Sequence, residues 1–217
     1  MTMVPKTNRL ILVAALAIGG LLSGCSGDEE RAESPKLRQC ETLLGAESVR
    51  AVVKATGGDD VSVSGTPQAD VLADQLVREA KEWRESDLLH NSYTGCRMDV
   101  FEGDRIIGVA DVQVQWSVLT LRMMDSPKQS RTWRQVNSSV YVEPEAASGF
   151  MHVIAACAVP GTIDSQPSDL PLQFDVSGPS LGKELRWDLL STFARSIVKE
   201  MDCMKPPIIP SALPATA

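Results

Sequence analysis

The sequence predicts an α+β domain in which helices pack on one mainly antiparallel sheet of five or six strands, with two disulfides. Three observations support this fold class. Residues 96–100 and 110–118 alternate apolar and polar side chains, as strands with one buried face do. Residues 182–203 carry apolar side chains at helical spacing. Four cysteines, at positions 40, 96, 157 and 203, follow a segment that resembles an export signal.

Composition narrows the possible functions. The chain has 217 residues, which fits one domain, and its formal net charge is −7. An acidic chain lacks the clustered Lys and Arg that neutralise phosphates, so we expect no nucleic-acid partner. The two histidines, His90 and His152, leave few options for histidine-based catalysis or metal binding, and we expect neither a metal nor a cofactor. No apolar run reaches the roughly 18 residues of a membrane-spanning helix.

Residues 1–24 are typical of an export signal. Lys6 and Arg9 form a positive start, and the apolar run that follows is too short for a stable membrane span. The run ends at Leu22-Ser23-Gly24-Cys25, which resembles the lipobox of bacterial lipoproteins. The resemblance implies cleavage before Cys25 and attachment of a diacylglycerol to its thiol. We therefore expect a chain held by lipid at the outer face of the cell membrane, with residues 25–34 as a polar tether.

The first helices and strand of the domain are expected over residues 35–83. Ser34-Pro35 suits a helix start, and apolar side chains over 37–44 share a helical face up to Gly45. A second helix over 49–53 stops at Gly57-Gly58, and 61–64 alternates as a short strand. A third helix over about 66–83 has a stripe made of Leu72, Leu76, Ala80 and Trp83. The charged residues around this stripe are interpreted as a solvated face.

The middle and end of the chain supply the other strands and the last helix. The turn at 102–104 predicts a hairpin between the two alternating runs, and Arg122 to Asn137 is expected to be a loop. Strands are then expected at 140–142, at the apolar run 150–159 and at 170–176, before a helix over about 182–203. A single extracytoplasmic domain over 35–204 follows, with a disordered proline-rich tail over 205–217.

Four cysteines in an exported chain predict two disulfides. The sequence contains no Cys-x-x-Cys pair and no histidine at ligand spacing, so a metal site is not favoured. Cys40 and Cys203 lie in helical patterns, whereas Cys96 and Cys157 lie in strand patterns. The favoured pairing is Cys40–Cys96 with Cys157–Cys203, which ties one helix to the sheet in each half of the domain. The alternative is Cys40–Cys203 with Cys96–Cys157.

The stretch from Cys40 to Gly45, followed by a helix at 49–53, resembles the start of an uncharacterised family of actinobacterial secreted lipoproteins. In that family a Cys-x-x-Leu-Leu helix opens an α+β domain behind a lipobox. The resemblance implies location and fold class and supplies no activity. The cysteine arrangement is also similar to two-disulfide extracellular sensor domains of some bacterial receptor kinases.

Gly178 to Gly182 satisfies the Gly-x-Ser-x-Gly pattern of a hydrolase nucleophile elbow, with Ser180 as the candidate nucleophile. Both histidines precede Ser180, whereas the hydrolase order places the histidine after it, so a turn with Ser180 as helix N-cap is favoured. His152 is interpreted as a core or edge residue and Trp116 as core, and Trp133 is a candidate pocket residue. Asp59-Asp60 and Asp164/Asp169 lack the alternating oxygens of a calcium loop.

An export signal, two disulfides and no catalytic set together favour a non-enzymatic lipoprotein that binds a protein or a small ligand at the cell envelope. The alternatives are a secreted hydrolase that uses Ser180 and a structural factor in envelope assembly. The identity of the ligand and its site are not apparent from the residues.

Overall fold

The computed structural model describes residues 34–87, 89–143 and 149–214, which belong to one compact unit, Glu33–Ala217. It confirms the α+β prediction, because helices pack on one antiparallel sheet. The helices among these residues are α1 (Pro35–Leu44), α2 (Ala46–Thr56), α3 (Ala69–Glu82), α4 (Leu121–Met124), α5 (Gln166–Asp169) and α6 (Lys183–Glu200), with a 3₁₀ turn at Gln129–Arg131. The strands are β1 (Asp60–Ser64), β2 (Tyr93–Glu102), β3 (Arg105–Trp116), β4 (Arg134–Asn137), β5 (Val140–Glu143), β6 (Phe150–Ala155) and β7 (Leu172–Ser177).

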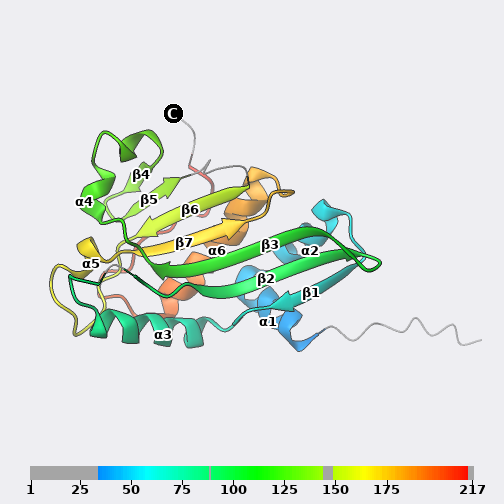
Figure 1. The fold of residues 1–217 in the computed structure, drawn as a ribbon, viewed down its shortest axis with the longest axis horizontal. Coiled ribbons are helices and arrows are strands. Elements are labelled where there is room, and N and C mark those ends of the chain that lie inside the picture. Colours follow the sequence, from blue (N-terminus) through cyan, green and yellow to red (C-terminus); the bar gives the residue numbers. More distant parts are fainter. Residues whose placement is uncertain (1–33, 88, 144–148, 215–217) are drawn as a thin grey trace, which may run out of the picture. The chain divides into compact units, whose positions relative to one another are not determined.

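The seven strands form one sheet in the order β1-β2-β3-β7-β6-β5-β4, and every neighbouring pair is antiparallel (Figure 1). Strands β3 and β7 join the two halves of the sheet, with Val112 opposite Val176 and Trp116 opposite Leu172. The last strand in the sequence therefore lies at the centre of the sheet.

The main core lies between the sheet and helices α1, α2, α3 and α6. Figure 1 shows α1, α2 and α6 behind the strands, and α3 at the lower left, along the edge of the sheet on the side of β1 and β2. Side chains of β3 and β7 alternate, so that Val114 and Phe174 are buried in this core while Gln115 and Asp175 lie on the opposite face. Phe174 packs edge-on against Phe193 of α6, with ring centroids 6.0 Å apart.

A smaller core lies on the opposite face of the sheet. Tyr141 of β5 and Ile154 of β6 point to this face, where Met124 and Trp133 from the segment after β3 cover them. The Tyr141 hydroxyl donates a hydrogen bond to Asp125. Trp133, the candidate pocket residue, is thus mainly a core residue.

The sheet has one strand more than the five or six that the sequence predicts. The additional strand is β4, which lies at the end of the stretch predicted as a loop, Arg122 to Asn137. It is a four-residue edge strand without buried side chains, and it therefore lacks the apolar alternation that marks a strand in a sequence. Strand β6 also ends at Ala155, earlier than the predicted 159.

The disulfides have the favoured pairing, Cys40–Cys96 and Cys157–Cys203, and the alternative pairing is excluded. The first joins α1 to β2. The second does not join a helix to a strand directly, because Cys157 follows β6 and Cys203 follows α6. Both bonds are buried. As predicted, each ties a helical segment to its own half of the sheet, the first at β2 and the second next to β6.

The C-terminal residues differ from the predicted disordered tail. Residues 205–214 lie on the domain, and Ile209 is only 6% exposed. Three side chains donate hydrogen bonds to backbone carbonyls of this segment: Asn137 to Ile208, Arg195 to Pro210 and Trp187 to Ser211. Prolines restrict the unfolded chain, so this segment loses little entropy when it docks in an extended form.

Candidate functional site

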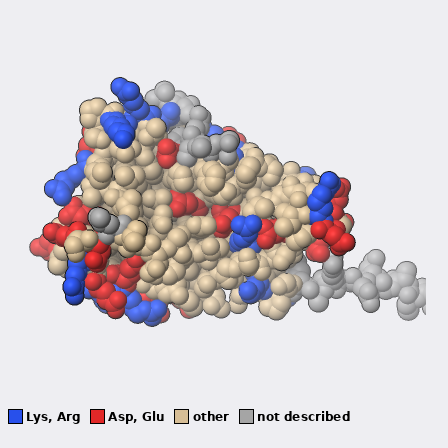
Figure 2. Space-filling view, viewed as in Figure 1, with Lys and Arg blue, Asp and Glu red and all other residues tan. Residues whose placement is uncertain are grey.

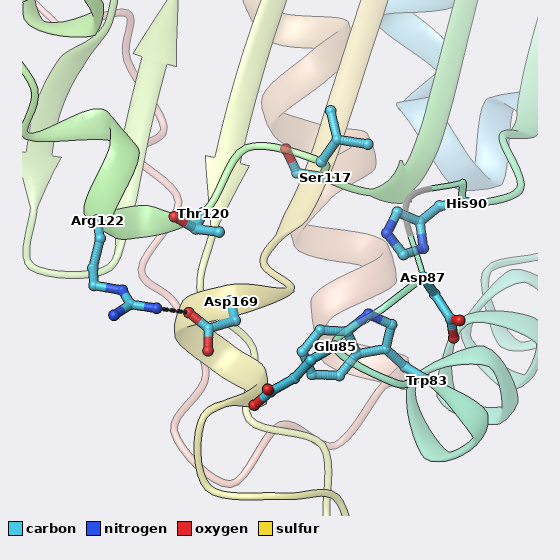
Figure 3. Close-up of a pocket in the computed structure, with 9 residues that line it drawn as sticks. Trp83, Glu85, Asp87, His90, Ser117, Thr120, Arg122 and Asp169 are labelled. Carbon is cyan, nitrogen blue, oxygen red and sulfur yellow. Dashed lines mark hydrogen bonds and ion pairs between the residues drawn. The ribbon is translucent and has the colours of Figure 1, made fainter.

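Two adjacent cavities lie where the chain leaves α3. The first has a volume of about 300 Å³ and the second about 550 Å³, and Trp83, Asp87 and His90 line both. We call them the Trp83 cavities. In the first cavity, Arg122 and Asp169 lie on one side and Asp87 and His90 on the other, with the Trp83 ring between them (Figure 3).

The position of this site depends on a contact between α3 and β3. Helix α3 buries the apolar stripe predicted from its sequence, which includes Leu72, Leu76 and Ala80. The buried Trp116 of β3 donates its indole N–H to the carbonyl of Leu76 over 3.0 Å. Because this bond connects the middle of the helix to the end of β3, it brings the segment after α3 close to the segment after β3.

A tight turn positions the carboxylates that follow Trp83. The Arg84 backbone N–H donates to Asp87 Oδ2, and the Asp87 N–H donates to the Arg84 carbonyl, both over 2.9 Å. Trp83 itself is partly buried against the main core. Glu85 and Asp87 remain exposed on the turn beside the ring.

Glu79 lines the second cavity and contacts His90. Its carboxylate accepts hydrogen bonds from the Asn91 backbone N–H and the Tyr93 hydroxyl, and His90 Nδ1 lies 3.5 Å from it. The side chain of His90 is only 5% exposed. Burial, together with the negative charge of Glu79, raises the pKa of Tyr93, so this hydroxyl remains a donor at physiological pH.

The far wall of the first cavity is formed by the segment after β3 and by α5. Ser117 is buried and donates to Gln173, and its hydroxyl accepts the Leu119 N–H. The Arg122 guanidinium lies 2.8 Å from the Asp169 carboxylate. The wall is thus polar, and one of its carboxylates already has a cationic partner.

The two cavities are lined by an excess of negative charge. Their acidic residues are Glu79, Glu82, Glu85, Asp87 and Asp169, and their basic residues are Arg78 and Arg122. Figure 2 shows acidic side chains, with basic ones among them, at the end of the molecule where Figure 1 places α3. Apart from the Asp169–Arg122 pair, this charge is only partly compensated within the site.

A second polar cluster lies on the face of the sheet away from the main helices. His152 Nδ1 contacts Asp175 across β6 and β7, and Gln173 and Gln115 donate to the same carboxylate. Figure 2 shows acidic side chains in a row across the middle of this face. The cluster lies outside the cavities.

Neither histidine lies beside the candidate nucleophile Ser180. His90 contacts Glu79 and His152 contacts Asp175, and no hydrogen bond among the described residues joins Ser180 to either ring. The prediction that Ser180 is a helix N-cap is wrong, since α6 begins after Gly182, which has no side chain to cap it. Ser180 lies instead in the exposed turn before the helix.

Two of the acidic candidates, Asp60 and Asp169, make side-chain contacts within the domain. Asp60 accepts a hydrogen bond from the Val61 N–H, and Asp169 is the partner of Arg122. Within the described ranges, no three His, Cys, Asp or Glu side chains are placed to hold a metal ion. In the same part of the chain, no helix is long and apolar enough to cross a membrane. The predicted lipidation residue Cys25 lies outside the described residues.

The chain matches no protein-family model, and no curated protein or solved structure is significantly similar to it. The resemblance to secreted lipoproteins therefore stays a prediction.

The site around Trp83 is not marked by any local sequence pattern. Trp83 occupies a helical stripe position, and the charges around it are typical of a solvated helix surface. The one available signal was an aromatic residue within an acidic run at a helix end. Its cavity partners, Ser117, Arg122 and Asp169, are distant in the sequence, so no local pattern connects them.

Proposed function

We propose that this chain is a non-enzymatic, lipid-anchored binding domain on the outer face of the cell membrane, and that it binds a small ligand in the first Trp83 cavity. The location rests on the export signal and the lipobox that ends at Cys25. The two disulfides agree with an oxidising compartment.

The observation that carries the ligand site is the first cavity itself. Its volume of about 300 Å³ lies at the lower end of the range for small-molecule sites. It combines an indole ring with converging polar groups from three separate segments, around Trp83, Ser117 and Asp169. Such a concave mixture of aromatic and polar groups favours a small molecule over a protein partner, which fits a flatter apolar surface better.

The test uses three probes of the same shape and different charge: choline, neutral 3,3-dimethyl-1-butanol and anionic 3,3-dimethylbutyrate. Each is titrated by calorimetry into the full-length chain in detergent. We expect at least one to bind with a stoichiometry of one. The proposal is overturned if none of the three binds.

A cavity-filling variant locates the bound probe. Val118 lines the first cavity and is 64% exposed, so Val118→Trp fills the space without removing a core side chain. The matched control is Ile106→Trp, because Ile106 is 52% exposed near the other end of β3. We expect Val118→Trp to abolish binding and Ile106→Trp to leave it unchanged. Equal binding by both variants would place the ligand elsewhere and contradict the proposal.

A further inference from the structure

We infer that the ligand of the first Trp83 cavity is a small organic ammonium ion, bound against the indole ring of Trp83 and beside the carboxylates of Glu85 and Asp87. This inference rests on the proposed function and specifies the chemical class of ligand at that site.

The first step concerns the aromatic ring. An ammonium group within about 6 Å of an indole ring is attracted to its electron-rich face, and tryptophan provides the strongest such interaction among the side chains. Trp83 lines both cavities, and it is anchored because part of the ring packs against the main core. His90, whose side chain is 5% exposed, adds a second ring to the cavity lining.

The second step concerns charge. Glu85 has no hydrogen bond or ion pair among the described residues, and Asp87 uses one oxygen for the turn at Arg84. The nearest basic residue of the first cavity, Arg122, is already paired with Asp169. The neighbouring cavity adds two further acidic residues, Glu79 and Glu82, against the single cation Arg78. An anion would therefore meet net repulsion in this site, whereas a cation would meet net attraction.

The third step separates an organic cation from a metal ion. A metal ion needs several oxygen ligands that converge at short distance. Among the described residues no such group of acidic or histidine side chains exists, and Figure 3 shows the carboxylates of Glu85, Asp87 and Asp169 apart from one another. Carboxylates that lie apart suit an alkylammonium ion, because its positive charge is spread over a larger volume than that of a metal ion. Its alkyl groups can also contact the indole ring.

The three probes of the binding test decide this inference separately from the proposed function. Choline and 3,3-dimethyl-1-butanol have the same shape and differ only by the positive charge. We expect choline to bind at least about tenfold more tightly than the neutral alcohol and the butyrate not to bind. The ammonium inference would be overturned if the alcohol or the butyrate bound more tightly than choline. If Val118→Trp abolished that binding, the binding-site proposal would still stand.

Two variants test the groups that would recognise the cation. Glu85→Gln removes an exposed, unpaired charge, and we expect choline affinity to fall about threefold to tenfold at low salt. The control Asp104→Asn removes the same charge from the β2–β3 turn, at the opposite end of β3 from Ser117, and is expected to leave affinity within about twofold. Equal losses in both variants would show a nonspecific charge effect and overturn the inference.

The aromatic contact is tested by Trp83→Phe, which keeps a ring and much of the packing. We expect a loss of choline affinity of about threefold or more, with little change for the neutral alcohol, because phenylalanine attracts cations more weakly. Circular dichroism and the melting temperature verify that the variant is folded. Unchanged choline affinity in a folded Trp83→Phe variant would contradict the assigned role of the indole.

Discussion

His152 Nδ1 lies 2.5 Å from Asp175 Oδ1, across the pairing of β6 with β7. Burial by itself would lower the pKa of His152, but the hydrogen bond and charge of Asp175 and the charge of Glu143 outweigh it and raise the pKa above 6.5. The ring centroids of Trp133 and Phe150 each lie 6.3 Å from that of the histidine. The histidine therefore keeps its proton to a higher pH than a free histidine does.

This pair predicts a pH-dependent stability. Because the pKa of His152 is raised in the folded state, its contribution is complete below pH 6.5 and is lost as the pH rises through the folded pKa. We expect the free energy of unfolding to fall over that window in the wild type. In Asp175→Asn the fall should shrink, and NMR titration of the His152 ring should give a lower pKa. An unchanged histidine pKa in the variant would contradict the pairing.

The charge of Asp111 is expected to destabilise the fold, whereas the charge of His152 is expected to stabilise it. It is only 8% exposed, its Oδ1 has no hydrogen-bond partner among the described residues, and burial raises its pKa above 3.8. Ionised Asp111 therefore costs stability at neutral pH, a cost that disappears as the pH falls through the folded pKa toward 3.8.

We therefore expect Asp111→Asn to melt at a higher temperature than the wild type at neutral pH, with the difference vanishing in acid. The amide oxygen can still accept the hydrogen bond from Gln113. Asp99→Asn is the control, because Asp99 accepts bonds from Arg97 and its replacement should give no gain. A melting temperature for Asp111→Asn at or below the wild type would show that its charge is compensated.

The disulfide pairing predicts the thiol content of double variants. Replacing Cys40 and Cys96 with serine should leave Cys157–Cys203 intact, so that neither of these two cysteines has a free thiol. Replacing Cys40 and Cys157 should leave both Cys96 and Cys203 without a disulfide partner. Loss of the first bond should lower the free energy of unfolding by up to about 4 kcal/mol, since the bond closes a long loop. Thiol titration and urea denaturation measure the two effects.

The bond from Trp116 to Leu76 predicts a specific loss of stability. Trp116→Phe keeps a ring but removes the indole donor from the Leu76 carbonyl, which retains its bond within helix α3, and this should cost about 1 kcal/mol. Trp133→Phe is a suitable control, because no hydrogen bond of the Trp133 indole is among those described for this part of the chain. Urea denaturation compares the two. A larger loss for Trp133→Phe would contradict the importance of the contact.

The proposed anchor predicts the behaviour of a Cys25 variant. Cys25→Ala removes the thiol that the lipobox resemblance assigns to lipid attachment, so the chain should remain an unlipidated, longer precursor. We expect metabolic labelling with palmitate to be lost and the precursor to leave the membrane fraction in high salt. Retention of the label in Cys25→Ala would exclude this site of lipidation.

Some features of this domain follow from local patterns, and the structure confirms them. Strands β2, β3 and β7 alternate apolar and polar residues because one face of the sheet packs on helices. Helix α3 has an apolar stripe at helical spacing for the same reason. The favoured disulfide pairing also followed from the elements in which the four cysteines were expected.

The sequence by itself thus determined the fold class and most of the elements, and it favoured the cysteine pairing that the structure then established. The tertiary structure alone decided that β7 lies between β3 and β6, that residues 205–214 dock on the domain, and that Trp83 lies beside a cavity. Local periodicity reports which side of an element is buried, but it does not report which distant segment covers it. Arg122 and Asp169 are 47 residues apart, and they meet only because packing of the sheet brings their segments together.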